Sequence, residues 1–177
     1  MVGAGLDEFD RADVLINNAG VGTAVPALRE RPEDFRKVID LNLNGAYRSA
    51  QACARVMKPG SSIVNVASSL GLITSYAPQA AYSAGKAGPM GLTRDLSAQW
   101  AGRLGIRVNA VAPGYFASEM TAPVPEDLLK GFVTERSPLD RPGRQHEPDA
   151  AVLLLASPAS LYITGSTLAV DGGVSGH

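Results

Sequence analysis

Short apolar runs alternate along the chain with longer stretches in which apolar residues recur at helical spacing. The short runs predict buried strands, and the longer stretches predict helices with one apolar face. The predicted strands are Asp13–Asn17, Ser62–Ala67, Ile106–Ala112 and Thr167–Val170, and the predicted helices are Pro32 to about Lys58, Tyr82 to about Gly102, and Asp149–Ala156. Alternating strands and helices require crossover connections, so we expect an α/β fold with a mainly parallel sheet and helices on both faces.

The first long helix has recognisable start and stop signals. Pro32 suits the first helical position, and two acidic residues follow it in the first turn. Pro59, followed by a glycine, ends the helix. Asn42, Asn44 and Gly45 lie in its middle and are poor helix formers. We therefore expect a kink or a loosened turn there, with a polar side chain directed at a partner outside the helix.

Polar residues and turns gather where the predicted strands end. Asn18, Ser68 and the Pro113-Gly114 pair follow three successive strands. In parallel sheets, ligands bind outside the carboxyl ends of the strands. The sequence therefore predicts a ligand site at this edge of the sheet, close to the start of the second long helix.

Tyr82 and Lys86 stand four residues apart in that helix, so they share one face. A free phenol and a free ammonium both titrate near about pH 10, and neither exchanges protons readily at neutral pH. A fixed ammonium beside a phenol favours the phenolate and lowers the pKa of the phenol. The pair can then serve as a general acid–base centre for an alcohol or a carbonyl. A surface lysine beside a half-buried tyrosine is the alternative reading of the pair taken alone.

Composition limits the partners and the compartment. The 177 residues, 45% of them hydrophobic, suit a single domain over residues 1–177. A net charge of −1 without a basic run argues against nucleic acid, and no apolar run is long enough to span a membrane. The single Cys53 excludes an intrachain disulfide and fits a cytoplasmic protein. With the widely separated His146 and His177, it forms no metal-ligand cluster.

Six motifs occur in order along the chain. They are Asn17-Asn18-Ala19-Gly20, Asn42-Leu43-Asn44-Gly45, Ile63–Ser68, Tyr82-Ser83-Ala84-Gly85-Lys86, Gly105–Gly114, and Ile163–Gly165 with Val170–Gly173. With them, essentially the whole chain resembles the short-chain dehydrogenase/reductase family, most of all its 3-oxoacyl-carrier-protein reductases and sugar or alcohol dehydrogenases. The resemblance implies a Rossmann-like three-layer fold, NAD or NADP as cofactor, and a small-molecule substrate that is interconverted between alcohol and ketone.

The resemblance also implies catalytic roles. Tyr82 would pass a proton to or from the substrate oxygen, and Lys86 would lower the pKa of Tyr82 and hold the nicotinamide ribose. Ser68 would donate a hydrogen bond to the substrate carbonyl. Asn42, at the expected kink, would hold a water molecule in a proton relay.

Further residues would bind the cofactor beside Tyr82 and Lys86. The implied set comprises Asn18, Ala19 and Gly20 near the ribose, Pro113, Gly114 and Phe116 beside the nicotinamide, and Ser118 at its carboxamide. The loop-rich insert from Tyr115 to about Arg144 would be the substrate lid, with an apolar lining of Tyr115, Phe116, Met120 and Phe132.

The chain departs from the family pattern at its front. The family's glycine-rich phosphate turn has no counterpart, because the glycines of Val2–Leu6 follow no strand. The family's first three strands, and the residue that selects NAD or NADP, are also absent. We therefore expect a truncated fold in which the Asp13–Asn17 strand is a bare edge.

Two smaller departures concern the site. The family spaces its serine and tyrosine as Ser69 and Tyr82 are spaced here, but Ser68 matches the strand end, so Ser68 is preferred and Ser69 remains the alternative. Pro89 removes the helical hydrogen bond to the Gly85 carbonyl, and we expect it to bend the helix beside Lys86.

Two functional hypotheses follow. The first is an NAD(P)-dependent oxidoreductase with Tyr82 as general acid–base. The second is a truncated, inactive relative that keeps an oligomerising interface and acts as an interaction protein. In both, the two long helices would form a homo-oligomer contact, as they do in the resembling family, with Ala46, Ala50, Ala87 and Gly91 permitting close packing.

Overall fold

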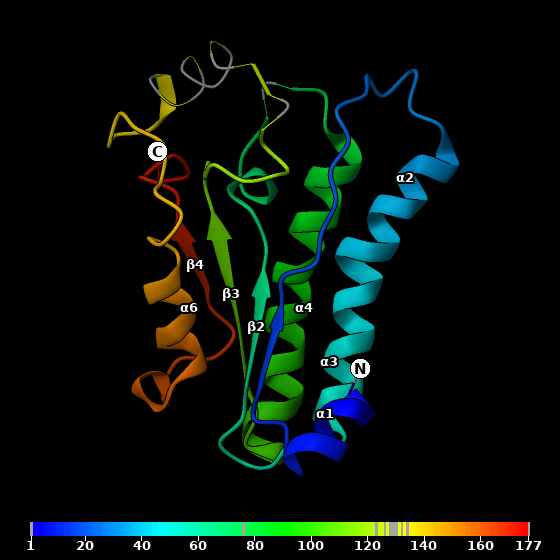
Figure 1. Ribbon diagram of the computed structural model, residues 1–177, viewed down its shortest axis with the longest axis vertical. Helices are drawn as coiled ribbons and strands as arrows, with labels where there is room; N and C mark the ends of the chain where they lie inside the picture. The colour runs from blue at the N-terminus through cyan, green and yellow to red at the C-terminus, as the bar shows by residue number, and fades with distance from the viewer. Residues whose placement is uncertain are drawn as a thin grey trace.

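The structure is a computed structural model of the chain, and it describes residues 2–75, 77–122, 124–125, 127, 131, 133 and 135–176. Its strands are β1 (Val14–Asn17), β2 (Ser62–Val66), β3 (Arg107–Pro113) and β4 (Thr167–Val170). Neighbouring strands are all parallel, in the order β1-β2-β3-β4. All four predicted strands and the parallel sheet are confirmed. Their carboxyl ends lie together at one edge of the sheet (Figure 1).

Helices cover both faces of this sheet. The α-helices are α1 (Val2–Phe9), α2 (Pro32–Ile39), α3 (Ala46–Ala54), α4 (Ala80–Leu104) and α6 (Asp149–Ala156), and the short 3-10 turns are η2 (Ser69–Gly71) and η3 (Pro158–Ser160). α3 and α4 lie on one side of the sheet and α6 lies on the other (Figure 1). This arrangement confirms the three-layer α/β fold. Helix α1 was not predicted from the sequence.

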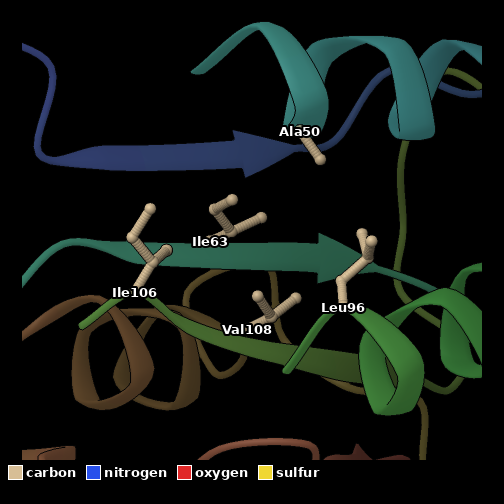
Figure 2. Close-up of a cluster of buried hydrophobic side chains, with 5 residues drawn as sticks. All are labelled: Ala50, Ile63, Leu96, Ile106 and Val108. Carbon is tan, nitrogen blue, oxygen red and sulfur yellow. The ribbon is translucent and has the colours of Figure 1, made fainter. Parts of the chain in front are cut away.

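The core forms where the central strands meet α3 and α4. Its largest cluster contains Ala50, Ile63, Leu96, Ile106 and Val108 (Figure 2). Every one of these side chains is at most 3% exposed. β-Branched residues suit the buried strands because they pack well on a pleated surface. The core therefore fixes α4, the helix that carries the candidate catalytic residues, against β2 and β3.

The first long helix is interrupted where its poor helix formers lie. A π-helix, η1 (Asp40–Gly45), separates α2 from α3. A π-helix is rare and marks a wider turn, often at a functional site. The loosened turn expected around Asn42 is thus confirmed, and the Asn42 side chain is directed out of the helix and buried.

Helix α4 continues without interruption through Pro89, from Ala80 to Leu104. Pro89 is buried within α4 and cannot donate a hydrogen bond to the Gly85 carbonyl; the bend expected there stays a prediction. A side chain at Gly88 would come within 2.7 Å of Leu43, so this glycine lets α4 approach η1 closely. The chain thus brings α4 and η1 together beside the carboxyl ends of the strands.

β1 is an edge strand with exposed apolar side chains, as expected. Val14 and Ile16 are 45% and 44% exposed.

No helix in the described part of the chain is both long and apolar enough to cross a membrane. Within the same residues, no group of three or more His, Cys, Asp or Glu side chains is placed to hold a metal ion.

Candidate active site

The candidate site is built at the carboxyl ends of β1 and β2 and at the start of α4. The loop after β1 brings Gly20 and Gly22 to α4. A side chain at Gly20 would lie 3.0 Å from the Lys86 Nζ, and one at Gly22 would lie 3.1 Å from the Tyr82 ring. Only glycine permits such contacts without displacing a neighbour. The loop therefore lies directly against the tyrosine–lysine pair.

Ser68 lies just beyond the end of β2, at the N-cap of η2, and interacts with Tyr82. Its Oγ accepts a hydrogen bond of 3.1 Å from the backbone N–H of Leu70, which caps η2. Burial raises the pKa of Tyr82, and an interaction with the Ser68 hydroxyl acts in the opposite direction. Ser69 is the first residue of η2, and its carbonyl accepts hydrogen bonds within that turn. Between the two alternatives, the geometry therefore favours Ser68.

Lys86 is almost completely buried, with 5% of its surface exposed. Its Nζ donates a hydrogen bond of 2.8 Å to the Val66 carbonyl at the end of β2. Desolvation by burial lowers the pKa of Lys86 to about 8. The ammonium therefore titrates close to neutral pH, far below the usual range of a lysine.

The expected effect of Lys86 on Tyr82 is not found in this structure. The pKa of Tyr82 is raised instead of lowered, because burial penalises the phenolate. The Lys86 Nζ lies 5.9 Å from the centre of the Tyr82 ring and is directed at Val66. The spacing correctly predicted that Tyr82 and Lys86 lie on one face of the helix. It did not account for the desolvation of the two side chains.

Asn42 makes a reciprocal pair of hydrogen bonds with the backbone of Val21. Its Oδ1 accepts from the Val21 N–H at 2.9 Å, and its Nδ2 donates to the Val21 carbonyl at 2.8 Å. A side chain at Gly85 would lie 3.1 Å from the Asn42 Cβ. Asn42 therefore connects the loop after β1 to α4, and its side chain acts on backbone atoms. The water-holding role implied for it remains a prediction.

A chain of side-chain hydrogen bonds runs from the end of β1 through β2 to α4. Asn17 donates to the Ala46 carbonyl at 3.1 Å and to the Asn65 Oδ1 at 2.9 Å. Asn65 in turn donates to the Thr93 hydroxyl at 2.9 Å. Asn17 thus joins the end of β1 to α3 and to the Asn65 side chain of β2. The contributions of Asn65 and Thr93 were missed, because a single buried polar residue in a strand or helix has no sequence pattern that reveals its partner.

The remaining predicted cofactor residues divide into two groups. Asn18 and Ala19 are exposed in the loop after β1, next to Gly20. Pro113 and Gly114 end β3, where the Gly114 N–H donates to the Val170 carbonyl at 2.9 Å. A side chain at Gly114 would lie 2.6 Å from the Asp171 Cα, so β3 and the segment after β4 are in close contact there.

The start of the predicted lid packs on itself. The ring of Phe116 covers Gly143, with which it forms a parallel bridge. The hydroxyls of Ser118 and Thr121 are 3.2 Å apart, and the Ser118 N–H donates to the Thr121 Oγ1 at 2.8 Å. Met120 is 47% exposed. The Phe132 assigned to the lid lies outside the described residues. The structure thus places Phe116 and Ser118 in contacts within the lid.

Comparison with known proteins identifies the family. The sequence model described as enoyl-(acyl carrier protein) reductase matches residues 1–175. An uncharacterized short-chain type dehydrogenase/reductase of Sinorhizobium fredii is 46% identical over 168 residues, which are 93% of this chain and 30% of that protein. A 3-oxoacyl-[acyl-carrier-protein] reductase of Synechocystis is 41% identical over 172 residues, 96% of this chain and 67% of that protein.

A solved structure extends the likeness to the fold. A gluconate 5-dehydrogenase from Burkholderia cenocepacia, in complex with NADP and tartrate, aligns with a TM-score of 0.88 at 34% identity. The alignment covers 99% of this chain and 71% of that one. This chain therefore spans about 30% of its Sinorhizobium relative and about two thirds of the others. By sequence and fold together, the chain belongs to the short-chain dehydrogenase/reductase family.

Proposed function

We propose that the protein is an NAD(P)-dependent oxidoreductase that interconverts a secondary alcohol and a ketone. The observation that carries the proposal is the buried cluster of Ser68, Tyr82 and Lys86 at the carboxyl edge of a parallel sheet. Perturbed titratable groups that share a site with a hydroxyl are typical of acid–base catalysis. Relatives named as dehydrogenases and reductases support the same class of reaction.

The residues fit the nicotinamide end of the cofactor. Lys86 uses one of its three N–H groups on the Val66 carbonyl, which leaves donors for ribose hydroxyls. Gly20 leaves open the space beside Nζ that a side chain would fill. The described residues show no glycine-rich turn between a strand and a helix, since Gly3 and Gly5 lie inside α1. The described residues therefore provide no phosphate-binding turn for the cofactor.

The proposed mechanism assigns one task to each side chain. A bound nicotinamide dinucleotide supplies or accepts the hydride. Tyr82 carries its proton at neutral pH, and burial raises its pKa further; it gives this proton to the substrate oxygen during reduction and takes it back during oxidation. Ser68 donates a hydrogen bond to the same oxygen, which holds the carbonyl beside Tyr82. Lys86, whose pKa is about 8, can return a proton to Tyr82 near neutral pH.

Tyr82→Phe is the direct test of the mechanism. The variant keeps the ring and loses the hydroxyl, so we expect turnover to fall by about 10²–10⁴-fold while the fold is retained. Tyr162→Phe removes a fully exposed hydroxyl and is the matched control. Oxidation of NADH and NADPH is followed with a panel of ketones, and circular dichroism checks the fold. Unchanged turnover in Tyr82→Phe would refute the mechanism.

Ser68→Ala and Ser69→Ala distinguish the two serines. We expect a loss of kcat in the first variant and activity close to that of the parent chain in the second. A folded chain that binds neither NADH nor NADPH in a calorimetric titration would instead support the inactive interaction protein.

We also propose a homo-oligomer with α3 and α4 at the contact. A groove there is lined partly by Tyr47, Gln51, Leu92 and Trp100. Tyr47 is 41% exposed at the edge of this groove, so its ring is available for a contact with a second chain. Light scattering should give a mass that is a multiple of 18.4 kDa. Tyr47→Glu should lower it to that of a single chain, whereas a monomeric parent would refute the contact.

A further inference from the structure

We propose that Thr93, through its hydrogen bond to Asn65, is a positioning residue for the acid–base pair. Thr93 lies in α4, about 16 Å along the helix axis from Tyr82. At that distance its side chain does not reach a substrate held at Tyr82, so it acts through the placement of Lys86. The inference rests on the proposed function, because it assigns a role in the same reaction to a residue outside the site.

Two side-chain hydrogen bonds join α4 to β2, which lie side by side (Figure 1). The Asn65 Nδ2 donates to the Thr93 hydroxyl at 2.9 Å, and the Lys86 Nζ donates to the Val66 carbonyl at 2.8 Å. Asn65 and Val66 are adjacent in β2. Lys86 and Thr93 are separated by about two helical turns, so they lie on one face of α4. Both bonds therefore belong to the same contact between helix and strand.

The bond between Asn65 and Thr93 can fix the register of α4 on β2 because it is buried. Asn65 is 2% exposed and Thr93 is 0% exposed. The Asn65 Oδ1 accepts from the Asn17 Nδ2 at 2.9 Å, which orients the amide so that its Nδ2 faces Thr93. A buried donor that loses its partner is costly, whereas the apolar packing around it has no preferred direction. The bond therefore opposes sliding of α4 along β2.

The active site depends on that register. A side chain at Gly71 would lie 2.8 Å from the Ala87 nitrogen and 2.9 Å from the Lys86 carbonyl carbon, so η2 lies directly against the backbone of α4. Ser68 is the N-cap of η2. Sliding of α4 would therefore change the placement of Tyr82 relative to Ser68 as well as the Lys86 hydrogen bond. A misplacement of about 1 Å can lower turnover by about 10²-fold.

Thr93→Val removes the hydrogen bond and keeps the branched shape of the side chain. Asn65 then lacks an acceptor in a buried position. Thr93→Ser retains the hydroxyl and should behave as the parent chain does. Ser97→Ala is the matched control, because it removes a buried hydroxyl of α4 whose bond, to the Arg94 carbonyl at 2.9 Å, stays within the helix. Thr93→Cys, with a weak sulfur acceptor, gives a milder form of the test if the valine variant does not fold.

The first measurement requires no turnover. The ¹³Cε resonance of Lys86 is identified by its loss in Lys86→Met and is then titrated by NMR. Burial holds the pKa of Lys86 at about 8, against an ordinary value of 10.5. Loosening of α4 on β2 admits water to the ammonium, so Thr93→Val should raise this pKa by about 1. Tyr82, whose ring centre lies 5.9 Å from the Nζ, is present in every variant.

Turnover supplies the second measurement. In Thr93→Val, kcat for ketone reduction per folded chain should fall on the order of tenfold, with a smaller change in KM for the cofactor. Thr93→Ser and Ser97→Ala should keep the kcat of the parent and its pKa at Lys86. The proposal is wrong if Thr93→Val leaves either quantity unchanged or if Ser97→Ala changes both equally. A raised pKa of Lys86 in a chain that reduces no ketone would refute the proposed function and leave the placement of Lys86 by Thr93 standing.

Discussion

Replacing Lys86 by methionine should change how stability depends on pH. Lys86 is 5% exposed and its pKa is about 8, against an ordinary value of 10.5. A shift of this size corresponds to about 3 kcal/mol of unfavourable free energy for the buried ammonium. The penalty is fully present below pH 8, where folded and unfolded chains both carry the proton. Between pH 8 and 10.5 the unfolded chain binds more protons, so stability rises with pH.

Methionine keeps the length and apolar stem of Lys86 and removes the titration. The hydrogen bond to the Val66 carbonyl is also lost, which costs about 1–3 kcal/mol at every pH. The quantity to measure is therefore the difference in free energy of unfolding between the parent chain and Lys86→Met. It is obtained from urea denaturation at pH 7 and at pH 10. Other titrating groups, including the buried Cys53 and Tyr82, are present in both chains and cancel.

We expect this difference to shift by about 2 kcal/mol in favour of the parent between pH 7 and pH 10. Lys58→Met removes an exposed ammonium and controls for the loss of one positive charge. A difference that stays constant across this pH range would show that Lys86 is not desolvated as the structure indicates. The proposed role of Lys86 in returning protons near neutral pH would then lose its physical basis.

Three further substitutions test the framework of the site. Gly114→Ala should destabilise the fold by about 1–3 kcal/mol in urea denaturation, because the new methyl would lie 2.6 Å from the Asp171 backbone. Arg107→Met should lose about 2–4 kcal/mol and the hydrogen-exchange protection of α6, since the buried guanidinium binds carbonyls at the end of that helix. Asn42→Ala should raise the KM for NADH more than it lowers kcat, because it frees the Val21 loop; unchanged kinetics would contradict this.

The arrangement of strands and helices could be read from the sequence because each element has its own periodic pattern. Thr167–Val170 and Asp149–Ala156 were predicted with the boundaries that the structure shows. The break at Asn42 was also predictable, because three poor helix formers interrupt a stretch of residues that favour a helix. Its form as a π-helix was not, because that depends on how η1 packs against α4. Helix α1 was missed because its glycines weaken the helical signal.

The site was predictable as a set of residues but less so as a set of contacts. Ser68, Tyr82 and Lys86 do lie together, as their motifs imply. The partner of Lys86 is the Val66 carbonyl, and a backbone atom has no signature in the sequence. Electrostatics were the weakest part of the prediction. Spacing shows which groups are neighbours, whereas burial decides the direction in which each pKa moves.

The two buried groups favour one direction of proton transfer. Burial raises the pKa of Tyr82 and lowers that of Lys86, so both groups are driven toward their neutral forms. A neutral phenol is a proton donor, which suits reduction of a ketone, whereas oxidation of an alcohol begins with a phenolate as acceptor. Near pH 7 the site therefore has its donor in place without any adjustment. Oxidation therefore requires more stabilisation of the Tyr82 phenolate than the Ser68 hydroxyl supplies, for example a positive charge close to it, to offset the desolvation.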